Sequence, residues 1–464
     1  MRGSAALRWA RLAAFGLLFG GSIATTGCAA DPSEGWPTAL PCDLPSAPRE
    51  GPDGPAHFDR DAMLCIRLGM DESAAASMRA EQRFEGPPFG AALAWAAQCT
   101  TPMPTDYTWF EAELFLDGAR WERVGIRKKG FVGSLSQRKP SLKLDSDRYV
   151  DGQRFGPHER VTLNNARQDV ARFTACLAYD VFAAAGVRAP RCNLANVMLG
   201  AEALGPYVHI EAMDRRFLER AFGDASGDFY EGTVSDVAPG FLPADGLGHW
   251  DPKTNATDPS GAALRALELA LEGPDEDLLE RLAPHVNIKR FLRYWAVEVL
   301  IGHTDSYSAA RNNFLIYFDP TDQRRATWIP WGADNVFRDG TAADDRDALT
   351  RFLHAELPRR LSQLPEVRGA LVAEVRAVLA EAWDEDALLA EVDRLAEQVR
   401  SAQDDPDYDA ELQRLRNWIT ARRARVQTWL DRGLRPGASE PQPCDSVLSP
   451  FFVGALFKDL AFGL

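Results

Sequence analysis

Residues 303–337 set acidic and amide side chains around a predicted β-hairpin, and this order constrains the fold more than any other feature of the chain. The apolar runs 314–318 and 326–331 are predicted strands, and the Asp-Pro-Thr-Asp between them is typical of a turn. Carboxylate and amide oxygens are the ligands that a hard cation such as Mg²⁺ prefers. These polar residues are, in chain order, Asp305, Asn312, Asn313 and Asp334.

A helix is predicted directly before this stretch, because apolar residues recur at helical spacing from Ile288 to Val299 and Gly302 follows as a stop signal. Helix, Asp-bearing loop, amide, hairpin and second Asp is the order of parts in a protein-kinase catalytic centre. There the first Asp accepts the proton of the substrate hydroxyl, while the Asn and the second Asp hold the metal ions on ATP. The alternative is that each of these residues only caps or turns the chain.

The same stretch resembles the signature region of CotH-type (spore-coat H) kinases, an atypical protein-kinase family whose pattern ends in Pro-Trp-Asp-x-Asp. In this chain Gly332 stands at the place of the first family Asp, and only Asp334 remains. The resemblance implies Asp305 as the base, Asp334 as the main metal ligand, and Asn312 or Asn313 as the assisting ligand. It also implies ATP and Mg²⁺ (or Mn²⁺) as cofactors, and transfer of phosphate to Ser or Thr of exported or surface proteins.

A second candidate region lies nearer the N-terminus, where a predicted hairpin around Asp117-Gly118 leads into a Gly/Ser-containing loop. Glycines let backbone amides approach phosphates closely, and a lysine on the next strand can neutralise them. We expect Lys143 to be that lysine, with Lys129 and Gly130 contributing from the loop. CotH-type proteins show a similar Gly-x-Arg-x-Lys-Gly run and a Lys-x-Ser-x-Lys strand. A plain turn between two strands is the alternative.

Two further matches to the family fall between these regions. Glu211 follows a predicted strand, where the family also carries a Glu, and could pair with Lys143 or join the metal shell. The alternative is an ordinary charged residue at a strand end. Asp169 and Arg172 fit an Asp-x-x-Arg of the family and are expected to be structural, with Asp169 capping a helix that runs to about Ala185.

The predicted fold class is α+β, a two-lobed atypical protein-kinase-like fold with a helical C-terminal region. The resemblance covers residues 58–433 as one kinase domain. Within it, residues 58–235 are expected to be mainly N-lobe-like and residues 260–433 mainly helical and C-lobe-like. Residues 235–260 are rich in Gly, Pro and Asp and suggest a surface insertion, and residues 434–464 form a C-terminal tail.

The N-terminus indicates an exported protein. Residues 1–27 hold arginines followed by an apolar run, and they end in Thr-Thr-Gly before Cys28, which resembles a bacterial lipobox. We expect lipidation of Cys28, a flexible stalk over residues 28–57, and attachment to the bacterial cell envelope as a periplasmic or surface-exposed lipoprotein. Ordinary secretion with cleavage near Ala30 is the alternative.

The net charge limits the binding partners of the protein, and the cysteines indicate disulfides. Net charge is −15, and loss of the leader with its three arginines and no acid would leave about −18. This excess argues against nucleic-acid binding and favours a basic protein substrate. Six cysteines besides Cys28 suggest up to three disulfides, with Cys176–Cys192 as the expected helix-to-strand pair. The cysteines show no C-x-x-C spacing, so a zinc site is not expected.

Two other functions compete with the kinase. The first is a noncatalytic surface lipoprotein, either a pseudokinase or an adhesin on the same fold, and Gly332 favours it. The second is a carbohydrate-active lipoprotein, but no pair of carboxylates in the sequence singles itself out for that chemistry.

Overall fold

The computed structural model describes residues 36–440 apart from 46–48, 52–53, 56, 86–87, 105, 256–259 and 339–349. The leader, Cys28 and the end of the tail lie outside the described residues, so the predictions for them stay predictions. The described residues combine helices with sheets whose strands pair antiparallel almost throughout, which is consistent with the predicted α+β class.

Seven strands of the N-terminal half close into a barrel that was not predicted. Its neighbours pair antiparallel except β4 and β9, which run parallel. The predicted turn at Asp117-Gly118 is confirmed, and both residues have positive φ, as a tight hairpin requires. The strands are β4 (Leu64–Gly69), β5 (Phe110–Leu116), β6 (Ala119–Lys128), β7 (Leu142–Asp145), β8 (Arg160–Asn164), β9 (Cys192–Leu199) and β10 (Glu202–Ile210).

A separate four-stranded antiparallel sheet has the order β12-β11-β13-β14. The predicted hairpin in residues 314–331 is confirmed as its β13–β14 pair. Residues 235–260, predicted as a surface insertion, instead supply β12 and the buried Trp250. The strands are β11 (Phe229–Gly232), β12 (Trp250–Pro252), β13 (Phe314–Asp319) and β14 (Arg325–Pro330).

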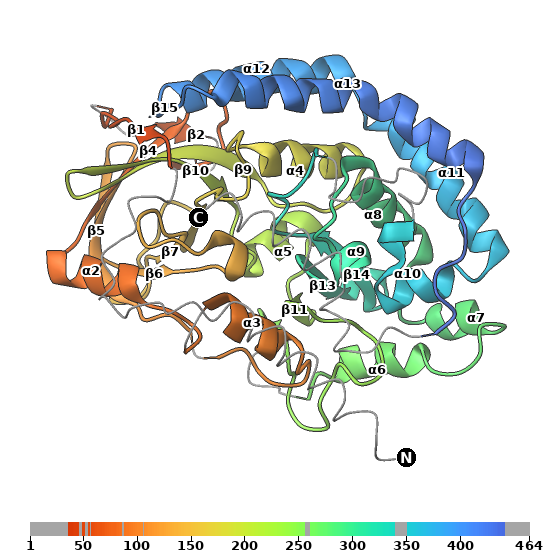
Figure 1. The fold of residues 1–464 in the computed structure, drawn as a ribbon. Coiled ribbons are helices and arrows are strands. Elements are labelled where there is room, and N and C mark those ends of the chain that lie inside the picture. Colours follow the sequence, from red (N-terminus) through yellow and green to blue (C-terminus); the bar gives the residue numbers. More distant parts are fainter. Residues whose placement is uncertain are drawn as a thin grey trace, which may run out of the picture. The chain divides into compact units, whose positions relative to one another are not determined.

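Helices pack against both this sheet and the barrel: α8 contacts β14, α4 contacts β9 and α2 contacts β6. Figure 1 shows α12 and α13 running side by side, and α8 packs on α11. α8 ends at Gly302, whose left-handed backbone (φ +67°) confirms the predicted stop. The helices are α2 (Glu72–Ala80), α3 (Pro88–Ala96), α4 (Thr174–Ala184), α5 (Arg215–Phe222), α6 (Ala262–Ala270), α7 (Leu278–Leu282), α8 (Ile288–Ile301), α9 (Tyr307–Ala310), α10 (Glu356–Leu361), α11 (Pro365–Glu381), α12 (Glu385–Arg400) and α13 (Tyr408–Arg432). Among the described residues, no helix combines the length and the apolar character that a membrane crossing needs.

The described part of the predicted stalk is packed against the body of the protein. β1 (Thr38–Ala39) pairs with β15 (Gln403–Asp404), and the Leu40 amide donates to the Ala402 carbonyl at 2.9 Å. The disulfide Cys42–Cys65 ties the same segment to β4. β2 (Glu50–Gly51) and β3 (Gly54–Pro55) form a small hairpin. From Trp36 onward the segment therefore differs from a flexible stalk.

The predicted disulfide Cys176–Cys192 is confirmed, with a Cα–Cα distance of 5.2 Å. It joins α4 to the start of β9, the helix-to-strand position expected from the sequence. The N-cap position of α4 is Phe173 and not Asp169, but both predicted residues are structural: Asp169 accepts a hydrogen bond from the Thr174 amide at 2.7 Å, and Arg172 donates to the Ala166 carbonyl at 2.7 Å.

Candidate functional site

Asp305 lies on the loop that follows α8. The buried carboxylate of Glu298 holds this loop through hydrogen bonds to Ser308. Glu298, on the last turn of α8, accepts hydrogen bonds from the Ser308 amide at 3.3 Å and from the Ser308 hydroxyl. The Glu298 side chain is fully buried, and burial raises its pKa to about 7. These hydrogen bonds connect the loop that carries Asp305 to the last turn of α8.

Two amides hold the Asp305 side chain. Asn312 Nδ2 donates to one carboxylate oxygen at 3.2 Å, and Asn313 Nδ2 donates to the other at 2.6 Å. Burial and the charge of Asp334 together raise the pKa of Asp305 to about 7, against the lowering effect of the amide donors. A carboxylate with a pKa near neutrality suits a general base, because it takes up a proton readily in the transition state.

The two adjacent amides have different tasks. Asn312 uses both ends of its amide, because its Oδ1 also accepts from the Val234 amide at 3.2 Å. Asn313 donates through Nδ2, and no hydrogen bond within the described ranges reaches its Oδ1. That oxygen faces Gly332: a Cβ added to Gly332 would lie 2.2 Å from it. Of the two asparagines predicted as assisting metal ligands, Asn313 is therefore the one whose side-chain oxygen is available to bind a metal ion.

Gly332 and Asp334 follow β14. Gly332 has φ +51°, and the Asn313 side chain fills the space next to its Cα. Asp334 is 8% exposed, and Asn164 Nδ2 donates to its carboxylate at 3.5 Å. Burial raises the pKa of Asp334, while the Lys129 ammonium acts in the opposite direction.

Lys143 lies on β7 and Lys129 directly follows β6 at the start of the loop, as predicted. The Lys129 amide donates to the Ser141 carbonyl at 2.9 Å, and Lys143 pairs with Arg127 in the β6–β7 ladder. The Lys129 ammonium lies 6.0 Å from the centre of the Trp331 ring, which places it near the Asp334 segment. Burial lowers the pKa of Lys129 and brings that of Lys143 to about 7, helped at Lys143 by the charge of Lys253.

The loop between these lysines turns at Gly130, whose φ is +109°. A Cβ at Gly130 would lie 2.1 Å from Ser134 Oγ, so only glycine fits this turn. Asn165 Nδ2 fixes the loop by donating to the Ser134 carbonyl at 3.0 Å and to the Lys139 carbonyl at 2.7 Å.

Glu231 and Lys253 were missed in the sequence, although both face the lysines. Their side chains form an ion pair at 2.5 Å between β11 and the end of β12. Burial alone would raise the pKa of Glu231, but the ammonium groups of Lys253, Lys143 and Lys129 outweigh it and hold that pKa at about 2. No local signal marks Glu231, because β11 is only four residues long.

Glu211 needs a correction. Its carboxylate forms ion pairs with Arg191 at 3.0 Å and with Arg220 at 2.6 Å, and it also accepts from the Arg191 amide at 2.9 Å. These arginines hold the pKa of Glu211 low despite its burial. Glu211 thus joins β9 and α5, and it is not the partner of Lys143 in this structure.

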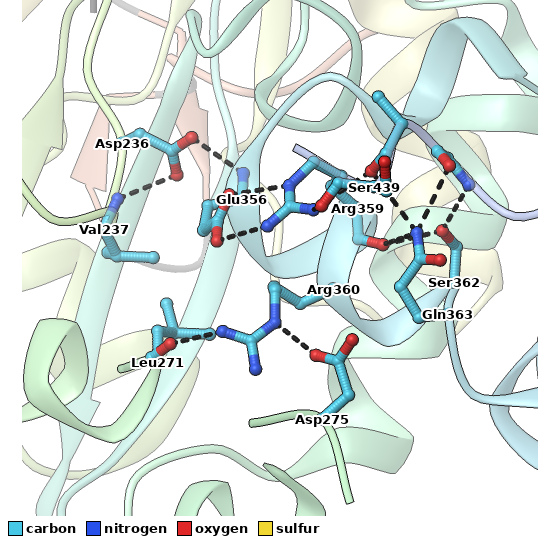
Figure 2. A network of polar contacts seen from close by, with 12 residues as sticks. Asp236, Val237, Leu271, Asp275, Glu356, Arg359, Arg360, Ser362, Gln363 and Ser439 are labelled. Carbon is cyan, nitrogen blue, oxygen red and sulfur yellow. Dashed lines mark hydrogen bonds and ion pairs between the residues drawn. The ribbon is translucent and has the colours of Figure 1, made fainter. Parts of the chain in front are cut away.

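A second buried polar network contacts the Asp305 loop at Tyr307. Asp236 accepts from the Tyr307 hydroxyl at 3.0 Å and from the Glu356 amide at 2.8 Å. Figure 2 shows Glu356 continuing the chain of contacts to Arg359, which donates to the Ser439 carbonyl at 2.9 Å. The network thus connects the loop to α10 and to the segment after α13.

The donor set suits a cation that takes much of its coordination from another molecule. Within the part of the chain that the structure describes, no group of three His, Cys, Asp or Glu side chains is arranged to hold a metal ion. Asp334 and Asn313 supply one carboxylate and one amide oxygen. Mg²⁺ commonly binds with one or two carboxylates plus phosphate oxygens and water, so these donors fit Mg²⁺ bound together with a phosphate group.

Comparison with known proteins gives the family of this α+β protein. The family model described as CotH kinase protein matches residues 126–428, which include every one of these site residues. The chain therefore belongs to the CotH kinase protein family. It is also similar to Invasin CotH3 of Rhizopus delemar, with 21% identity over 213 residues, 43% of this chain and 35% of that protein. The match thus spans about a third of that relative's length.

Proposed function

We propose that this protein is a CotH-like protein kinase that transfers phosphate from ATP to Ser or Thr of exported or surface proteins. The observation that carries the proposal is the Asp305 carboxylate, held by two amides near buried Asp334 and the lysine cluster. On this proposal the barrel acts as the N-lobe, and the small sheet with its helices acts as the C-lobe of a two-lobed kinase-like fold.

Each residue then has a defined task. Asp305 accepts the proton of the substrate hydroxyl, because its raised pKa lets it take up a proton near neutral pH. Lys143 and Lys129 bind the phosphate groups of ATP, and Gly130 allows the loop backbone to approach them. Asp334 and Asn313 would hold Mg²⁺ or Mn²⁺, which when bound neutralises charge on the phosphates.

The sequence supports a proposal for the location and the substrate of the kinase. Lipidation of Cys28 would place the kinase on the cell envelope, where ATP must be supplied to it. The net charge of −15 favours basic substrate proteins, because opposite charge speeds encounter.

A noncatalytic surface protein is the second candidate. Gly332 favours it, because the site holds one carboxylate where the family pattern has two. The name Invasin CotH3 points in the same direction, since it describes a surface role for that relative.

Calorimetric titration with Mg-ATP separates the two candidates. The kinase proposal expects wild-type protein to bind ATP, and Lys143→Gln to weaken binding about tenfold or more, since a hydrogen bond to a charged group contributes ~1.5–3 kcal/mol. Lys289→Gln, at an exposed lysine of α8, is the matched control and should bind like wild type. Absence of ATP binding at millimolar nucleotide would favour the noncatalytic candidate.

A further inference from the structure

The segment between β11 and β12 is bound to the loop that carries Asp305. Asn312, one of the two amides that hold Asp305, also accepts a hydrogen bond from the Val234 amide at 3.2 Å through its Oδ1. The next amide of the segment, that of Ser235, donates to the Arg311 carbonyl at 2.8 Å. Two successive residues of the segment therefore contact the loop of the candidate base.

Val234 has an unusual backbone conformation in this segment. Its φ is +49°, in the left-handed region that branched side chains rarely adopt, and its side chain is fully buried. Its carbonyl accepts a hydrogen bond from His249 Nδ1 at 3.0 Å, and the Thr233 amide donates to the His249 carbonyl at 3.4 Å. Residues strained in this way persist only where their surroundings hold them, and they cluster at functional sites.

His249 extends these contacts to Trp95 on α3. The two rings stack, with their centroids 3.8 Å apart and their planes at 26°. Trp95 is buried, and its Nε1 donates to the carbonyls of Thr101 and Pro102, both at 3.0 Å. Stacking on one face and hydrogen bonds at the edge therefore fix the Trp95 ring.

Trp95 in turn packs against the loop that turns at Gly130. Phe131 follows Gly130 directly, and its ring centroid lies 5.5 Å from that of Trp95 and 5.9 Å from that of Phe84, edge to face with both. Edge-to-face aromatic pairs are favourable beyond the area that they bury. Val234 packs in the same hydrophobic cluster, so one set of side chains holds both the strained segment and the Gly130 loop.

We propose that Trp95 and His249 are positioning residues for the nucleotide: they hold the Gly130 loop against the segment that is bound to the Asp305 loop. The backbone of the Gly130 loop is then ordered before the phosphates arrive, which strengthens binding because the cost of ordering is already met in the free protein. This inference rests on the proposed function, because it concerns the same nucleotide site. It gives α3 and residues 233–249, which carry no candidate catalytic group, a part in ATP affinity.

The test is calorimetric titration of full-chain variants with Mg-ATP. Trp95→Ala should raise Kd about tenfold, because ordering one loop residue on binding costs free energy of that order. Trp95→Phe keeps a ring against Phe131 and should bind within about threefold of wild type. His249→Ala acts on the loop through Trp95 and should also raise Kd about tenfold, and the double variant should lose no more than Trp95→Ala alone.

Trp121→Ala is the matched control. Trp121 lies near the start of β6, at the other end of the strand from the Gly130 loop, and packs edge to face on Phe155 at 5.3 Å. Its replacement removes an aromatic contact of the same kind away from the loop, so this variant should bind Mg-ATP like wild type. Circular dichroism establishes that each variant is folded.

The outcomes separate this inference from the proposed function. Wild-type affinity in folded Trp95→Ala and His249→Ala overturns the inference and leaves the kinase proposal standing, whereas wild-type protein that does not bind Mg-ATP overturns both. Losses that add in the double variant, or an equal loss in Trp121→Ala, also overturn the inference. If Trp95→Ala does not fold, His249→Ala decides: weakened binding there, with Trp95→Phe close to wild type, supports the positioning role, and unchanged binding contradicts it.

Discussion

Replacement of Asp305 by Asn tests the electrostatics of the site through stability, without any assumption about the substrate. The wild-type carboxyl is partly buried, and its pKa rises from 3.8 to about 7, first because of burial. Between these two pH values the folded protein binds more protons than the unfolded chain, so wild-type stability falls as pH rises. Asp305→Asn removes this titration.

The magnitude follows from the pKa. A difference of about 3 between folded and unfolded pKa values, at ~1.4 kcal/mol each, makes ionised Asp305 cost the folded state about 4 kcal/mol above pH 7. About 2 to 3 kcal/mol of this change falls between pH 5 and pH 8. The new amide can accept from only one of Asn312 and Asn313, which costs about 1 kcal/mol at every pH.

Urea denaturation of both proteins at pH 5 and pH 8 measures the effect. The free energy of unfolding of Asp305→Asn relative to wild type should increase by about 2 to 3 kcal/mol from pH 5 to pH 8. Asp245→Asn, at an exposed aspartate, is the matched control for the chemical change itself. A difference between Asp305→Asn and wild type that stays constant over this range would refute the argument.

Three further predictions concern the lipidation of Cys28, the Cys176–Cys192 disulfide and the hydrogen bonds of Asp236 to the Asp305 loop. Cys28→Ser should move the protein from the membrane fraction to the soluble fraction; a variant that stays membrane-bound and is processed identically contradicts lipidation. Replacing Cys176 and Cys192 by Ser should lower the free energy of unfolding by about 3 kcal/mol for a separation of 16 residues, measured by denaturation with and without reductant. Asp236→Ala should cost about 2 to 4 kcal/mol, because it leaves the Tyr307 hydroxyl and a buried amide unpaired, whereas Asp245→Ala should cost little; equal costs would contradict the network.

Local sequence signals predicted much of the backbone arrangement around the candidate site. Asp305, Asn312 and Asn313 lie within nine residues of one another. The structure brings them together as expected, because the end of α8 and the β13–β14 hairpin fix the backbone on both sides of them. Asp117-Gly118 predicted a tight turn because both residues tolerate positive φ. The cysteine pair was predictable because one member lies on the predicted helix and the other just beyond it, where a helix-to-strand disulfide is geometrically possible.

Pairings between distant segments were beyond these signals. Glu231 reaches the site because β11 pairs with β13, more than eighty residues further along the chain. Lys253 belongs to a Gly- and Pro-rich segment whose composition suggested a surface insertion, yet β12 pairs with β11. Glu211 was predicted to pair with Lys143 or to join the metal shell because it follows a strand. Its actual partners, Arg191 and Arg220, are seen only in the structure. The parallel β4–β9 pair that closes the barrel has no local sequence mark either.

Transfer of label from γ-labelled ATP tests the central claim most directly. Wild-type protein, incubated with a library of basic Ser- and Thr-containing peptides, should transfer label, while Asp305→Ala should transfer none and still bind ATP with nearly wild-type affinity. This split is expected because the base acts on the substrate hydroxyl, whereas the lysines hold the nucleotide. Undiminished transfer by Asp305→Ala would contradict the role of Asp305, and wild-type protein that binds ATP but labels no peptide would contradict the kinase account itself.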